Sequence, residues 1–196
     1  MRTAEITRNT TETQISCTLK LDGGGRYKID TGCGFFNHMM ELFARHGRFD
    51  LTLVCKGDTH VDDHHTVEDA GIVLGRAFAE ALDGGAGILR YGSLMLPMDE
   101  ALVAVAVDIS GRGGLYDTLS FGSEKIGSFD TQLVREFWAA FARSLGATIH
   151  MRQMAGGNSH HLAEACFKGL ARAMSIAVSA DEKADGALPS TKGTLL

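Results

Sequence analysis

A short signature, H-H-x-x-E, occurs twice in this chain of 196 residues, at positions 64–68 and 160–164. Each copy runs on into an apolar pattern of helical period. Residues four apart on a helix lie on one face, so the first His and the Glu of each copy can chelate one ion. The second His is turned by about 100° from the first and serves a different ion. The duplication therefore predicts two metals, each taking a His/Glu pair from one copy and a lone His from the other.

A single copy would be typical of an ordinary helix N-terminus with exposed histidines, whereas two copies in register favour metal ligands. The repeat extends upstream, because residues 38–45 align with residues 136–143 and Phe-Ala-Arg recurs at 43–45 and 141–143. This alignment pairs His38 with Glu136. The predicted metal ligands are His38, His64, His65, Glu68, Glu136, His160, His161 and Glu164.

Nitrogen and oxygen ligands without thiolates suit an octahedral first-row ion such as Mn²⁺ or Fe²⁺ better than structural zinc. The general affinity order favours zinc or copper, so the ions available in the cell decide which metal is bound. Polar residues precede both signature helices, and either capping the helix or orienting the imidazoles explains them. These residues are Asp62, Asp63, Asn158 and Ser159.

Composition and charge exclude several classes of protein. The chain has no apolar run of about 18 residues, as a transmembrane helix needs, and no signal-peptide core at its start. With a net charge of −5 and no basic block, neither nucleic acid nor an anionic membrane is an expected partner. The four cysteines have no C-x-x-C spacing, so we expect reduced, buried thiols in a cytoplasmic protein.

The order of apolar patterns predicts an α+β fold, an internally duplicated α/β layer sandwich whose two similar halves each pack a small sheet against two helices. In the first half we expect strands at 3–21, 26–30 and 49–55, helices at about 35–46 and 63–82, and a hairpin turn at 22–25. The second half is expected to have one extra strand: strands at 93–97, 101–109, 115–121 and 147–154, and helices at about 130–145 and 159–179. The predicted divisions are residues 1–92, residues 93–186 and a C-terminal tail at 187–196, all forming one compact unit.

Five motifs that span nearly the whole chain in order resemble the imidazoleglycerol-phosphate dehydratase family of histidine biosynthesis. They are Gly34-Phe-Phe-Asn-His-Met-Met, His60-Val-Asp-Asp-His-His-Thr-Val-Glu-Asp, Ser110-Gly-Arg-Gly, Gly157-Asn-Ser-His-His-Leu-Ala-Glu-Ala-Cys-Phe-Lys and Pro189-Ser-Thr-Lys-Gly. The resemblance implies a hydro-lyase with two Mn²⁺ per active site. It also implies a homo-oligomeric shell of twenty-four copies, with metal ligands drawn from neighbouring subunits.

The resemblance also implies a role for each matching residue. One metal would take His38, His65, His160 and Glu164, and the other His64, Glu68, His161 and the residue at 136. Many family members have His at that last position, whereas this chain has Glu136, which can still ligate manganese. The family usually has Asp where this chain has Asn37. The positions expected to bind the phosphorylated imidazole substrate are Glu12, His46, Arg90, Arg112, Lys168, Ser190, Thr191 and Lys192.

From the residues alone, a single basic side chain is more typical of a solvated surface than of a phosphate site. Lys168 differs because it lies four residues after Glu164, on the same helix face as the predicted ligands, which points to an anion beside the metals. The segment 190–193 offers hydroxyls, backbone N–H groups and a cation, which suit phosphate. As a bare tail it would more often be disordered.

The implied reaction removes water from the glycerol side chain to give imidazole acetol phosphate. Two cations on the ring nitrogens favour an imidazolate, which can expel the C3 hydroxyl to leave a diazafulvene-like intermediate. Loss of the C2 proton to a carboxylate then gives an enol, and Glu12 is the expected proton shuttle, with Glu68 or Glu164 as alternatives. Two other functions also fit a dinuclear site: a metal-storage shell and a dinuclear hydrolase of phosphate esters.

Overall fold

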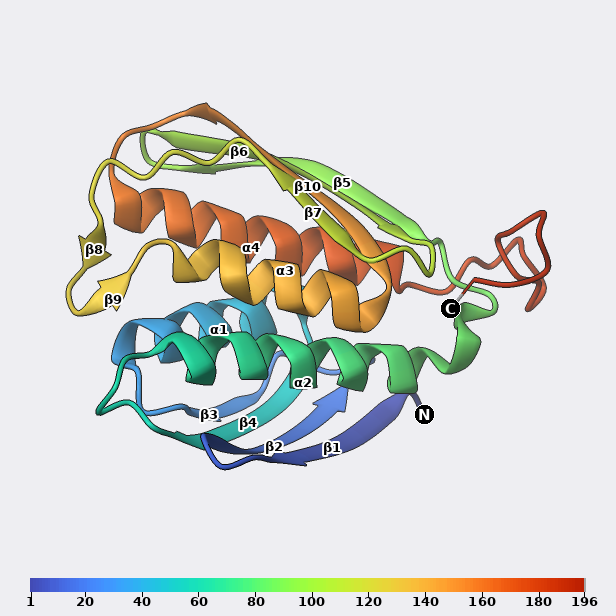
Figure 1. Ribbon diagram of the computed structural model, residues 1–196. Coiled ribbons are helices and arrows are strands. Elements are labelled where there is room, and N and C mark those ends of the chain that lie inside the picture. Colours follow the sequence, from blue (N-terminus) through green and yellow to red (C-terminus); the bar gives the residue numbers. More distant parts are fainter. Residues whose placement is uncertain (196) are drawn as a thin grey trace.

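The computed structural model describes residues 1–195 as two four-stranded sheets that enclose four helices (Figure 1). The first half contains β1 (Thr3–Asn9), β2 (Thr13–Lys20), β3 (Tyr27–Asp30), α1 (Gly34–Gly47), β4 (Asp50–Gly57) and α2 (His64–Leu82), followed by the 3₁₀ turn η1 (Asp83–Gly85). The second half contains β5 (Tyr91–Met98), β6 (Ala101–Ile109), β7 (Gly114–Asp117), the short β8 (Lys125–Ile126) and β9 (Phe129–Asp130), α3 (Leu133–Leu145), β10 (Ala147–Ala155) and α4 (Ser159–Ala177). The predicted duplicated α+β sandwich is confirmed.

The two large sheets have the same topology. Their strand orders are β1-β2-β4-β3 and β5-β6-β10-β7, and in each the last strand pairs in parallel with its neighbour. The register also repeats: Thr3 lies opposite Lys20 in the first sheet, and Tyr91 lies opposite Asp108 in the second. The first two strands of each half therefore correspond at an offset of 88 residues, whereas the signature helices α2 and α4 correspond at 96.

Two details of the expected first half are wrong. The stretch 3–21 is two strands rather than one, so in each half three strands of the four-stranded sheet precede the first helix. The only further strands of the second half within residues 1–195, β8 and β9, pair with each other in a separate two-stranded sheet. The turn between β1 and β2 contains neither Gly nor Pro. It is formed by the Thr10 hydroxyl, which accepts the N–H groups of Glu12 and Thr13 at 3.2 and 2.9 Å. Such side-chain turns lack the sequence markers of ordinary hairpins.

The glycine segment 22–25 does not form a hairpin turn. It crosses from β2 to β3, which pairs in parallel with β4 at the far edge of the sheet. The Asp50 carboxylate holds this crossing by accepting the N–H groups of Gly24 and Arg26 at 2.8 and 3.0 Å. The glycines indicated that the chain changes direction here, but not that β3 would pair with β4.

The helices form the two inner layers of the sandwich. Helices α1 and α2 cover the first sheet, α3 and α4 cover the second, and between the layers α1 packs on α4 and α2 on α3 (Figure 1). Their contact is rich in buried aromatic side chains: Phe36, Phe43, Phe78, Phe137, Trp138, Phe141 and Phe167. All four helices run in the same direction, so both H-H-x-x-E signatures lie at one end of the molecule. None of the helices among residues 1–195 is long and apolar enough to cross a membrane.

Candidate metal centre and active site

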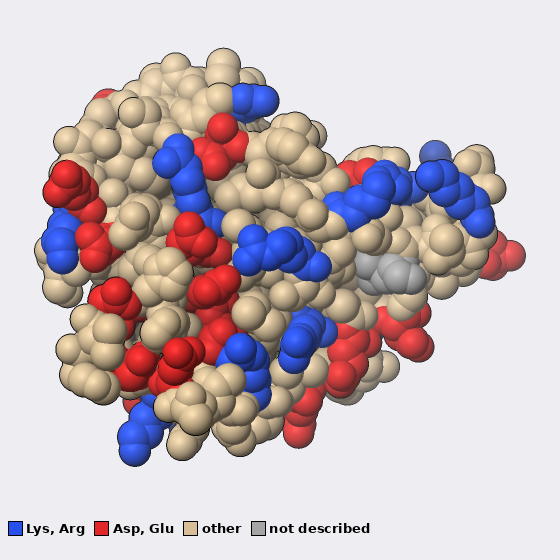
Figure 2. Space-filling view, viewed as in Figure 1, with Lys and Arg blue, Asp and Glu red and all other residues tan. Residues whose placement is uncertain are grey.

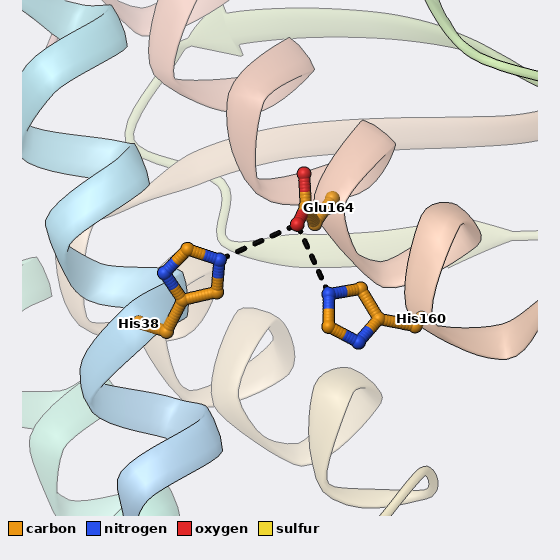
Figure 3. A group of neighbouring side chains, drawn as sticks. All are labelled: His38, His160 and Glu164. Atoms are coloured by element: carbon orange, nitrogen blue, oxygen red, sulfur yellow. Dashed lines mark hydrogen bonds and ion pairs between the residues drawn. The ribbon is translucent and has the colours of Figure 1, made fainter.

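Helices α1 and α4 bring together two imidazoles and one carboxylate (Figure 3). Oε1 of Glu164 lies 3.3 Å from Nε2 of His38 and 3.0 Å from Nε2 of His160. One ligand atom from each residue falls within 4.8 Å of the other two. The Glu164 side chain is 9% exposed, whereas the two imidazoles are 45% and 43% exposed. The cluster therefore combines a buried carboxylate with two half-exposed imidazoles whose Nε2 atoms face it.

The start of α4 sets the directions of the paired histidines. Asn158 caps this helix, as one of the two explanations predicted, because its side chain accepts the N–H groups of His160 and His161 at 2.9 and 3.3 Å. The planes of the two rings are inclined by 81°. Of the two, only His160 points toward Glu164, and His161 points elsewhere. The helical spacing predicted that adjacent histidines would point in different directions.

Lys168 binds the second oxygen of the Glu164 carboxylate. Burial raises the pKa of Glu164, but hydrogen bonds from Lys168 and His160 outweigh it and lower this pKa to about 2. The Lys168 ammonium group pairs with Oε2 and lies 3.5 Å from the sulfur of Met98. A cation thus lies directly beside the cluster, as the four-residue spacing indicated.

The first signature is arranged less tightly. Nε2 of His64 lies 3.8 Å from Glu68, and Arg143 also contacts the Glu68 carboxylate at 3.4 Å. Glu136, on α3, occupies the position equivalent to His38. Within residues 1–195, however, only His38, His160 and Glu164 form a group of three ligand atoms this close. One chain therefore does not bring Glu136, His64 and Glu68 into a comparable cluster.

The remaining two signature histidines each contact a carboxylate through Nδ1. His65 lies 3.0 Å from Asp58, and His161 lies 2.7 Å from Glu100, and these hydrogen bonds raise the pKa of both imidazoles. Such contacts fix ring orientation and leave Nε2 as the ligand atom. Neither histidine joins the His38 cluster within the described part of one chain.

Sequence reasoning missed Asp58 and Glu100 as the orienting carboxylates. Glu100 could have been found, because it is the equivalent of Glu12 at the 88-residue offset, in the turn between β5 and β6. Asp58 follows β4 in a loop whose path the sequence did not specify.

Several predicted phosphate-binding residues lie at the other end of the molecule. Arg90 donates to Asp108 and to the carbonyl of Pro189, both at 2.7 Å, and Arg112 lies 3.8 Å from Asp108. The turn at 190–193 holds Ser190, Thr191 and Lys192, and the Ser190 hydroxyl accepts the Lys192 N–H at 3.2 Å. This segment projects beyond the end of α4 (Figure 1), with basic side chains along one side of the projection (Figure 2).

The separation of these two groups can be estimated along α4. The backbone N–H of Arg90 donates to the carbonyl of Ala177, the last residue of α4. At 1.5 Å per residue, Ala177 lies about 20 Å along the helix from Glu164. Within one chain, therefore, Arg90 and the tail lie far from the cluster of His38, His160 and Glu164.

Of the two other predicted contact residues, Glu12 lies beside the first signature, whereas His46 lies at the end of α1, next to the second half of α4. Oε1 of Glu12 lies 3.9 Å from Nε2 of His65. His46, on α1, lines a pocket of about 380 Å³ together with Arg48 and Arg172. Burial, followed by the charges of Lys168 and Arg172, lowers the pKa of His46. The cations around this imidazole suit the neighbourhood of an anion.

Comparison with known proteins decides the family. Residues 31–174 match the family model described as imidazoleglycerol-phosphate dehydratase. The chain belongs to the imidazoleglycerol-phosphate dehydratase family. The predicted resemblance and the predicted enzyme class, a hydro-lyase, are both confirmed.

Relatives and solved structures of that family match along the whole chain. Dehydratases of this name from Methylorubrum extorquens and Cereibacter sphaeroides are 56% and 58% identical over 195 residues, covering 100% of both chains in each pair. The crystal structure of the Staphylococcus aureus dehydratase has a TM-score of 0.83 and 40% identity, covering 91% of this chain and 99% of its own. The crystal structure of the Pyrococcus furiosus dehydratase has a TM-score of 0.83 and 36% identity, covering 97% of this chain and 100% of its own. The duplicated sandwich is thus the fold of this family.

Proposed function

We propose that this chain catalyses the metal-dependent dehydration of D-erythro-imidazoleglycerol phosphate to imidazole acetol phosphate in histidine biosynthesis. The observation that carries the proposal is the convergence of His38, His160 and Glu164 beside the ammonium group of Lys168. Ligands for a divalent cation and a partner for an anion thus lie together where α1 meets α4. Four buried free cysteines support the cytoplasm as the compartment.

The proposed cofactor is a pair of Mn²⁺ ions per active site. The donor set fits such ions, because imidazole nitrogens and carboxylate oxygens without thiolates converge at the cluster. One ion is assigned to His38, His65, His160 and Glu164, and the other to His64, Glu68, Glu136 and His161. When bound, the ions supply Lewis acidity that favours the anionic form of the substrate ring.

The proposed site is completed by other copies of the chain. Three of the four residues assigned to the first ion meet within one chain, while His65 remains beside Asp58. Bond lengths of about 1.5 Å make a ring joined to a three-carbon phosphate roughly 10 Å long. That is about half of the 20 Å between Glu164 and Arg90. The tail and Arg90 of one copy therefore serve the cluster of another, in a homo-oligomer for which we propose twenty-four subunits.

The chain's own side chains are assigned distinct steps. The phosphate is held by Lys168 of one copy together with Arg90, Arg112 and the 190–193 turn of another copy. This anchoring keeps the ring in register. The hydroxyl leaves the carbon next to the ring, and a proton leaves the following carbon. Glu12, beside His65, takes that proton. The resulting enol becomes the ketone of imidazole acetol phosphate.

A combined measurement tests this proposal. Metal content by mass spectrometry is determined alongside a dehydration assay on imidazoleglycerol phosphate. Two Mn²⁺ per chain and a loss of turnover on chelation, restored by Mn²⁺, are expected. Full turnover by metal-stripped protein would contradict the proposal. Release of inorganic phosphate would favour a hydrolase, and loading with iron well beyond two ions per chain would favour storage.

A further inference from the structure

A polar network that is buried at Asp69 and Thr13 and partly exposed at Arg8 ties α2 to the first hairpin. The carboxylate of Asp69, which is 7% exposed, pairs with the guanidinium of Arg8 and accepts a hydrogen bond from the hydroxyl of Thr13. Arg8 and Thr13 also contact each other, at 3.4 Å between Nη1 and Oγ1. Thr13 is 1% exposed. The network thus joins both strands of the hairpin to the residue that follows Glu68.

The network continues to the backbone of Glu12. The Thr13 hydroxyl lies 3.3 Å from the Thr10 hydroxyl, which accepts the N–H of Glu12 at 3.2 Å. The carbonyl of Glu12 accepts the N–H of Asp58 at 3.1 Å. A pocket of about 230 Å³ borders this turn, so packing does not support it on that side. Hydrogen bonds therefore fix where the Glu12 carboxylate projects.

The second half of the molecule lacks this network at the equivalent positions. At the 88-residue offset Arg8 and Thr13 correspond to Leu96 and Ala101, and at the 96-residue offset Asp69 corresponds to Ala165. These three apolar residues are buried, at 8%, 1% and 0% exposure. The contact between hairpin and helix is thus made by an ion pair in the first half and by aliphatic packing at the equivalent positions of the second half.

The comparison of the two halves shows whether folding alone requires the polar network. Replacing a buried or partly buried ion pair by packed apolar residues is often neutral or stabilising. The second half shows that this fold accommodates the apolar version. Folding therefore gives no reason for the polar version in the first half. The two turns differ in another respect, because Glu100, the equivalent of Glu12, is engaged by His161 at 2.7 Å, whereas Glu12 remains 3.9 Å from His65.

We infer that Asp69, Arg8 and Thr13 are positioning residues that aim Glu12 at the substrate. This inference rests on the proposed role of Glu12 in proton transfer. The network acts on the turn at Thr10–Thr13 and not on the phosphate, so its loss reduces kcat rather than substrate binding. General acid–base groups contribute about 10²–10⁴-fold to rate, and a misdirected group forfeits part of this.

The test transplants the apolar residues of the second half into the first, as the triple variant R8L/T13A/D69A. We expect the assembled, metal-loaded variant to keep its thermal midpoint and its metal content. Its kcat should fall at least about tenfold, with KM changed less than about threefold. T13S, which keeps the hydroxyl, is the matched control and should retain kcat within about twofold.

Combination with E12Q distinguishes the inference from the proposed function. If the network acts through Glu12, adding the triple substitution to E12Q lowers kcat no further, because effects transmitted through one group are not additive. Full activity of E12Q alone would refute the proposed role of Glu12. An inactive E12Q with a fully active triple variant would refute the inference. So would a loss of kcat that follows a parallel loss of metal or of thermal midpoint.

Discussion

Nε2 of His38 lies 3.3 Å from Oε1 of Glu164, although 126 residues separate them in the chain. The contact exists because α1 of the first half packs on α4 of the second. Its equivalent under the internal repeat would join Glu136 to Glu68, two like charges, in place of a His and a Glu. The two assigned ion sites therefore differ in charge.

Loss of the His38–Glu164 pair should weaken one ion site. We expect H38A and E164Q each to lower bound Mn²⁺ by about one ion per chain and to reduce turnover at least about a hundredfold, because the remaining donors cannot complete the coordination. Metal content after desalting measures this. H150A is the control, since His150 stacks on Tyr116 on the second sheet. Normal metal content in H38A would contradict the assignment.

Glu136 offers a separate test of the second ion site. E136A should lose about one ion per chain, while E136H should retain both, because imidazole and carboxylate can each ligate manganese. Metal analysis and the dehydration assay together measure this. If E136A retains two ions and full turnover, Glu136 is not a ligand.

Lys168 is expected to act on the anion and not on the metal. K168A should raise KM about tenfold or more while manganese stays bound, because the ammonium group contributes charge beside the cluster. Steady-state kinetics with metal analysis measure this, and K28A, an exposed lysine on β3, is the matched control. Loss of metal in K168A would show that its role is to hold Glu164 in place.

The shared site predicts complementation between inactive variants. E164Q damages the cluster end and K192A the tail end, so a mixture that is dissociated and reassembled should regain activity that neither variant has alone. A mixture of E164Q with H38A should not recover, since both alter the same cluster in one chain. Activity that never reappears in the first mixture would contradict assembly of one site from two copies.

The packing between the inner helix layers is expected to contribute strongly to the free energy of unfolding. Trp138 is fully buried and packs against Phe43, Phe137 and Phe167 at centroid distances of 5.6, 4.5 and 4.7 Å. W138A should therefore lower the free energy of unfolding by about 3–5 kcal/mol, whereas W138F should cost less. Denaturant unfolding measures both. Equal losses in the two variants would argue against a cavity effect.

Most of the fold was predictable because its causes are local or repeated. Apolar periodicity predicted the four helices, and the doubled signature predicted the symmetric halves. The hairpin at Thr10–Glu12 was missed because a threonine hydroxyl forms the turn in place of Gly or Pro. The partner of β3 was missed because strand order depends on tertiary packing.

The candidate site was predictable in its members but not in their placement. Spacing along α4 predicted that His160, Glu164 and Lys168 share a face. Asp58, which orients His65, lies in a loop whose path no local pattern marks. Glu100, which orients His161, is 61 residues away in the chain, and only the repeat offset from Glu12 marks it. The distance between Arg90 and the cluster follows from helix length and direction, which only the structure supplies.

The placement of cluster and tail at opposite ends of α4 bears on how damage spreads. In the proposed assembly each copy supplies the metal-ligand cluster of one reaction centre and the phosphate-binding tail of another. A polypeptide altered at both ends of α4 and incorporated among normal ones then impairs its neighbour's reaction centre as well as its own. Mixed populations should consequently lose output faster than the proportion of altered chains, a dominant pattern that arises from the length of one helix.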